Sequence, residues 1–142
     1  YIRLCAALDI PVCAPESVGN FPYSRPVWIL RKACDMGRTE IRYNGITGCK
    51  KTVDLYEAFG MRATIHGTGW GNIQICASTD VGTTEYYERG LLAPGFDEEY
   101  EKPAPYLREI SDPLDDEGNV IVPQKTGLGF EINFDYVDAN RI

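Results

Sequence analysis

Short apolar runs alternate with amphipathic stretches along the first 90 residues. The spacing of apolar residues predicts helices over 1–8, 24–34, 45–59 and 70–78, and short apolar runs predict strands over 10–14, 38–43, 61–65 and 84–87. The clearest helix is 45–59, because its apolar residues form a single stripe and Gly60 follows as a C-terminal glycine. Strands joined by helices in this way predict a parallel sheet with right-handed crossovers.

From Gly90 onward the pattern changes. Several prolines and an acidic stretch at 97–101 predict an extended surface segment, and two β-rich runs follow at 119–123 and 130–134, on either side of a Gly-Leu-Gly turn. The sequence therefore predicts two parts, a set of four βα units over 1–90 and a C-terminal extension over 91–142. The first helix starts without a capping residue, which suggests that the fold continues upstream.

Composition and charge exclude several classes of function. The net charge of −7 argues against nucleic acid or an anionic membrane as a partner. Apolar runs all fall short of the roughly 20 residues that span a bilayer, so we expect a soluble, cytoplasmic protein. The five cysteines are an odd set without a CxxC pair, which predicts reduced thiols in a reducing compartment.

Three ionisable residues each follow a predicted strand. They are Glu16, His66, which is the only histidine of the chain, and Glu88. Each residue has a simpler interpretation: Glu16 as a loop carboxylate, His66 as a structural histidine and Glu88 as a surface ion beside Arg89. In parallel α/β folds, however, ligands bind at the carboxyl ends of the strands, so the position that the three residues share favours a functional role. A carboxylate suits a hard divalent cation, a histidine can transfer a proton near neutral pH, and a second carboxylate can hydrogen-bond an oxygen.

The glycine-rich turn at 67–71 gives a poor match to a phosphate-binding loop, because no lysine stands at the required place. A nucleotide function is therefore not favoured.

Four segments of the chain resemble one enzyme family. They are LCAALDIPVCAPES, YNGITGCKKTVDLYEAFGMRATIHG, EYYERG and TGLGFEINFDYVDAN. They are similar to the C-terminal half of the mandelate racemase branch of the enolase superfamily, whose members use a metal to abstract a proton next to a carboxylate. The resemblance covers nearly the whole chain. It implies an α/β fold, the C-terminal portion of a (β/α)8-type (TIM-like) barrel, with a tail that packs on an N-terminal capping domain.

The resemblance also implies roles for the strand-end residues. Glu16 matches the metal-ligand glutamate after the fifth barrel strand, His66 the general base after the seventh, and Glu88 the glutamate after the eighth that hydrogen-bonds the enolate oxygen. Many members pair the histidine with an aspartate at the end of the sixth strand. Thr39 stands at that place and carries no charge, and Glu40 beside it is expected to point to the opposite face unless the strand shifts by one residue.

By this resemblance the protein is expected to be a Mg²⁺-dependent lyase that dehydrates an acid sugar. A racemase or epimerase of a 2-hydroxy acid is the close alternative, and a non-catalytic relative is a second one, because Thr39 lacks a charge. The expected partners are an acid-sugar or 2-hydroxy-acid substrate, the upstream half of the barrel with its capping domain, and further copies of the chain in a homo-oligomer.

Overall fold

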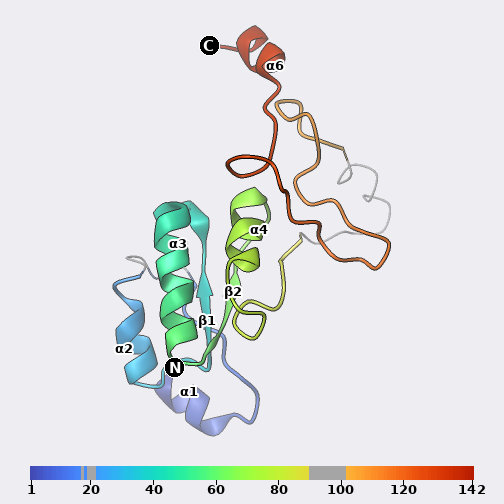
Figure 1. The fold of residues 1–142 in the computed structure, drawn as a ribbon. Coiled ribbons are helices and arrows are strands. Elements are labelled where there is room, and N and C mark those ends of the chain that lie inside the picture. Colours follow the sequence, from blue (N-terminus) through green and yellow to red (C-terminus); the bar gives the residue numbers. More distant parts are fainter. Residues whose placement is uncertain (17, 19–21, 90–101) are drawn as a thin grey trace.

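The structure is a computed structural model that describes residues 1–16, 18, 22–89 and 102–142 (Figure 1). Short helices precede a small parallel sheet, whose strands alternate with longer helices. The helices are α1 (Ile2–Ala7), α2 (Arg25–Leu30), α3 (Ile41–Ala58), α4 (Trp70–Ala77) and α6 (Phe134–Ala139), and the strands are β1 (Met36–Thr39) and β2 (Arg62–Ile65). The predicted boundary at 90/91 and the acidic stretch at 97–101 lie outside the described residues.

Strands β1 and β2 pair in parallel, with Met36 opposite Arg62 and Thr39 opposite Ile65. The predicted strands at 10–14 and 84–87 each contribute one parallel bridge on the outer sides of this pair, Cys13 with Met36 and Ile65 with Tyr87. Four consecutive segments therefore run in parallel, as the alternating sequence pattern predicts. Their carboxyl ends meet at one edge of the sheet.

Helices α3 and α4 pack against the sheet through two buried clusters. One joins Tyr56 of α3 with Ala63 of β2 and Ile29 of α2, and the other joins Val53 of α3 with Ile65 of β2 and with Ile75 of α4. These residues repeat every three or four positions on the helices and every two on the strands, which is the spacing that puts them on one face of each element.

The predicted strand at 38–43 is wrong at its carboxyl end. The strand stops at Thr39, and residues 41–44 form a helical turn that leads into α3. Gly45, with φ +62° and ψ −175°, produces a kink inside α3, so the regular helix begins where the sequence places it. The alternation of Ile41 and Tyr43 resembles a strand, but Ile41 packs against the cluster between α3 and α4. Tertiary packing here outweighs the local β propensity.

The C-terminal extension, defined here as the described residues 102–142, has little regular structure. Isolated antiparallel bridges join Leu107 to Ile132 and Leu114 to Val120, in place of the expected β-rich runs. Helix α6 was not predicted, and its N-cap is Asn133, whose side chain accepts a hydrogen bond from the backbone N–H of Tyr136. The extension lies beside α4 (Figure 1).

All five cysteines are free thiols; Cys34 and Cys49 are buried, whereas Cys13 is exposed and does not belong to the core. Burial raises the pKa of three of them to about 11: Cys34, Cys49 and Cys76. Among the described residues, none of the helices has the length and apolar character needed to cross a membrane.

Candidate active site

The predicted ionisable residues come together at the carboxyl ends of the parallel segments. One ligand atom each from Glu16, Glu40 and His66 lies within 4.8 Å of the other two. The Nδ1 of His66 contacts Glu16 Oε1 directly. Side chains from three segments of the sheet thus share one site, although Glu16 and His66 are fifty positions apart in sequence.

Arg38 connects two of the predicted residues. Its Nη2 donates a hydrogen bond of 2.7 Å to Glu88 Oε2, and its Nε lies 3.3 Å from Glu16 Oε2, which is an ion-pair distance. Its Nη1 donates to the hydroxyl of Thr64 on β2 at 3.1 Å. Glu88 therefore lies next to the cluster through Arg38, and the guanidinium offsets the negative charge of two carboxylates.

The expected faces of Thr39 and Glu40 are wrong. A Cβ on Gly37 would lie 2.2 Å from the ring of Tyr56, so Gly37 faces α3, and Thr39, two residues later, shares that face. Thr39 is fully buried beside Cys49 of α3. Glu40 instead lies on the side of His66 without any shift of the strand, because the pairing of Thr39 with Ile65 places Glu40 level with His66.

Glu40 is almost completely buried at the edge of a cavity. Its side chain is 6% exposed, and its Oε1 lies 2.8 Å from the Nε of Arg42, which is an ion-pair distance. The cavity has a volume of about 460 Å³ and is also lined by His66 and by Leu128 of the C-terminal extension. The site therefore has room for a small molecule beside both a carboxylate and an imidazole.

Arg25 of α2 holds the backbone around Glu16. Its guanidinium is fully buried and donates to the carbonyl oxygens of Glu16 at 3.3 Å and Val18 at 3.1 Å, and to the hydroxyl of Ser24 at 2.9 Å. Burial lowers the pKa of Arg25. The position of Glu16 thus depends on a buried cation from the next helix.

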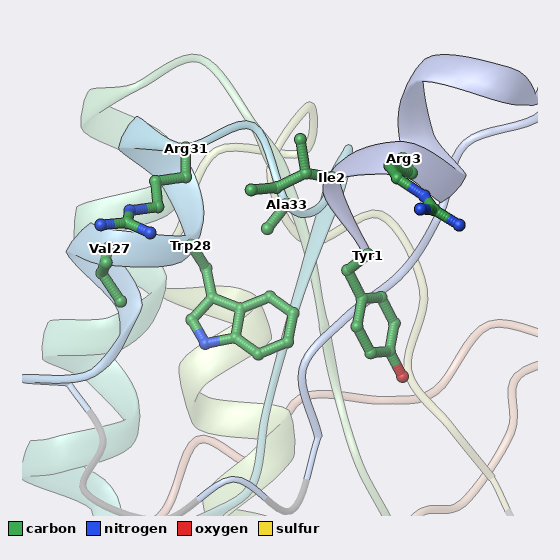
Figure 2. Close-up of a pocket in the computed structure, with 7 residues that line it drawn as sticks. All are labelled: Tyr1, Ile2, Arg3, Val27, Trp28, Arg31 and Ala33. Carbon is green, nitrogen blue, oxygen red and sulfur yellow. The ribbon is translucent and has the colours of Figure 1, made fainter.

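A second cavity, of about 360 Å³, lies between α1 and α2. The rings of Tyr1 and Trp28 pack there in a T-shaped arrangement, with centroids 5.1 Å apart and an interplanar angle of 66° (Figure 2). Its lining includes two arginines, Arg3 and Arg31, but neither a carboxylate nor an imidazole among the described residues. The cavity beside His66 holds both a carboxylate and an imidazole, so it is the candidate active site.

Comparison with known proteins identifies the family. Residues 1–137 match the family model described as enolase C-terminal domain-like. The chain belongs to this family. It is therefore an α/β chain that forms the C-terminal portion of a (β/α)8-type barrel, as the resemblance implied.

Solved structures have a similar fold. D-glucarate dehydratase from Agrobacterium tumefaciens, solved as a complex with magnesium, is 42% identical with a TM-score of 0.91, over 99% of this chain and 36% of that chain. A mandelate racemase/muconate lactonizing enzyme-like protein from Rubrobacter xylanophilus is 18% identical with a TM-score of 0.73, over 99% and 35%. A mandelate racemase/muconate lactonizing enzyme from a Sulfitobacter species is 17% identical with a TM-score of 0.69, over 97% of this chain and 33% of that chain. The last two show likeness of fold alone.

The search of curated proteins found no match. The chain spans little more than a third of the length of the glucarate dehydratase.

The sequence did not predict the roles of Arg38 and Arg42. The sequence contains a signal for Arg38, which is a charged residue inside a predicted strand. It stands two positions before Glu40, and this spacing puts both side chains on one face of a strand. Arg42 was hidden because its segment was assigned to the strand instead of to α3. The position of Leu128 in the cavity depends on long-range packing of the extension, for which the sequence gives no local signal.

Proposed function

We propose that the full-length protein is a Mg²⁺-dependent lyase that dehydrates an acid sugar by removing the proton next to its carboxylate. The observation that carries this proposal is the convergence of Glu16, Glu40 and His66 within 4.8 Å beside a cavity. The 42% identity with D-glucarate dehydratase supports the choice of a dehydratase within the family.

The donor set fits a hard divalent cation in part. Mg²⁺ prefers oxygen ligands, which Glu16 and Glu40 supply, whereas the imidazole nitrogen of His66 is a poorer ligand for it. Glu16 is the proposed ligand, and further ligands would come from the rest of the protein, the substrate and water. When bound, Mg²⁺ would hold the substrate carboxylate and lower the cost of the negative charge that develops there.

His66 is the proposed base. Because Glu16 contacts Nδ1, the other ring nitrogen, Nε2, would take the proton from the substrate. The carboxylates of Glu16 and Glu40 lie beside the imidazole that would take the proton. Glu88 would accept or donate a hydrogen bond at the substrate oxygen, with Arg38 holding it in place.

The two alternatives to a dehydratase are a racemase or epimerase and a non-catalytic relative. A racemase or epimerase shares the proton abstraction but returns the proton without losing water. A non-catalytic relative is the alternative that the neutral side chain of Thr39 favours; the carboxylate of Glu40, on the side of His66, supports the catalytic proposal instead. Homo-oligomer formation and a cytoplasmic location stay predictions.

The test is a screen of acid sugars with the full-length protein and Mg²⁺, with 2-keto acid formation as the readout. Formation of a 2-keto acid that stops when the metal is chelated would support the proposal. Exchange of the substrate α-proton with solvent without a keto acid would favour a racemase or epimerase, and the absence of both reactions across the panel would contradict an enzymatic role on these substrates.

A further inference from the structure

The loop that follows His66, residues 67–69, is fixed at two points. On one side, Asn72 of α4 donates its side-chain N–H groups to the carbonyl oxygens of His66 at 3.0 Å and Gly67 at 2.7 Å. On the other side, the backbone N–H of Gly69 donates to the phenol oxygen of Tyr87 at 2.6 Å. Gly69 has a φ of +117°, which residues other than glycine rarely adopt. The hydrogen bond to Tyr87 thus holds the backbone of Gly69 in an uncommon conformation.

Tyr87 is in turn bound by a buried carboxylate from the C-terminal extension. Its hydroxyl donates to Asp112 Oδ2 at 3.0 Å, and Asp112 Oδ1 accepts from the hydroxyl of Ser111 at 3.3 Å and lies 3.8 Å from Arg89 Nε. Asp112 is only 1% exposed. Because a buried carboxylate is costly unless it is hydrogen-bonded and charge-paired, these contacts make Asp112 a fixed anchor.

The same extension also attaches to α4, the helix that begins at this loop. The rings of Trp70 and Phe130 stack with centroids 4.2 Å apart, and Gln74 Nε2 donates to the carbonyl oxygen of Pro123 at 3.1 Å. The loop therefore lies between a helix and a strand end, and the extension contacts both.

We propose that Asp112 and Tyr87 are positioning residues, through which the C-terminal extension sets the position of the loop after His66. The loop lines the cavity that holds His66 and Glu40, and Leu128 of the extension lines it as well. Loss of the Tyr87–Asp112 pair would let the loop and the attached imidazole drift from a productive position. The catalytic part of this inference rests on the proposed function, whereas the structural part does not.

The first test is hydrogen exchange in the full-length protein without substrate. In Tyr87→Phe the amide of Gly69 loses its acceptor, and we expect it to exchange about tenfold faster or more, because local opening is no longer opposed by this bond. Asp112→Asn removes the charge that holds Tyr87, and we expect a smaller change in the same direction. Tyr86→Phe is the matched control, because the neighbouring Tyr86 is 74% exposed and should leave the exchange unchanged.

The second test is steady-state kinetics on the acid sugar that the wild-type protein turns over. Misplacement of a catalytic group by about 1 Å can cost about a hundredfold in rate, so we expect Tyr87→Phe to lower kcat about tenfold while KM changes less than about threefold. A purely structural role would lower the active fraction without this selective loss of kcat per active site. Unchanged kcat in both Tyr87→Phe and Asp112→Asn would overturn the positioning role.

The two proposals fail in different ways. Unchanged exchange at Gly69 in Tyr87→Phe would overturn the positioning role whatever the enzyme's activity. A wild-type protein that turns over no acid sugar would refute the proposed function, and the exchange experiment would still decide whether the extension holds the loop.

Discussion

The buried guanidinium of Arg25 gives a quantitative prediction about the loop that carries Glu16. Arg25→Met keeps much of the side-chain length but removes the donors to the carbonyl oxygens of Glu16 and Val18. A hydrogen bond to a charged group contributes about 1.5–3 kcal/mol, so the loss of these two part-buried bonds costs at most about 3–6 kcal/mol. The variant no longer buries a charge, which offsets part of this cost, and we expect a net loss of about 2–4 kcal/mol in the free energy of unfolding.

The assay is urea unfolding of the full-length protein, combined with a Mn²⁺ titration of the folded variant. Because Arg25 binds the backbone of Glu16 itself, metal affinity should fall together with stability. Arg62→Met is the matched control: Arg62 is 60% exposed and pairs at 3.3 Å with Glu85, so its loss should cost less than about 1 kcal/mol. An effect of Arg25→Met no larger than that of the control, with unchanged metal affinity, would refute the role assigned to Arg25.

Three further predictions concern metal affinity, packing and pH. Glu16→Gln should weaken Mg²⁺ or Mn²⁺ binding about tenfold or more, because a neutral amide replaces an anionic ligand, and unchanged affinity in a metal titration would return Glu16 to the class of loop carboxylates. Gly37→Ala should destabilise the protein by about 1–3 kcal/mol or more, because the new Cβ would lie 2.2 Å from the ring of Tyr56. Thermal unfolding measures this effect, and an unchanged Tm would show that the ring can move. Stability should fall as pH rises from about 9 toward 11. The thiols of Cys34, Cys49 and Cys76 have pKa values near 11 in the folded protein and 9.0 in the unfolded chain, so the unfolded state releases its protons first and is favoured. A urea midpoint that does not change over this pH range would contradict the burial of these three thiols.

The sequence predicts the elements that one local pattern determines. The apolar stripe of α3, the glycine after it and the run from β2 into His66 all stand where the pattern places them. Each of these features depends on residues that are close together in the sequence, because the local spacing of apolar residues determines which of them share one face of a helix or strand. The gathering of strand-end residues follows from the parallel topology, which the alternation of elements indicates.

The errors come from features that a single residue or a distant contact decides. Because side chains alternate along a strand, an error of one position exchanges the faces of Thr39 and Glu40, and the neighbours that settle the register are Gly37 and the ring of Tyr56 on α3. Helix α6 was missed because its aromatic and β-branched residues favour a strand, whereas its cap at Asn133 selects a helix. Arg38 contacts Glu16 and Glu88, which are far away in sequence, so its role needs the folded sheet.

The role of His66 as the base is the central claim, and exchange of the substrate α-proton with deuterated solvent tests it most directly. The comparison is between the full-length wild-type protein and His66→Asn, each with Mg²⁺ and the acid sugar that the wild type accepts, and a Mn²⁺ titration establishes that the variant still folds and binds metal. We expect exchange to slow by at least about a hundredfold in the variant, which is the usual cost of losing a general base. Exchange at the wild-type rate would contradict the account, because another residue would then remove the proton.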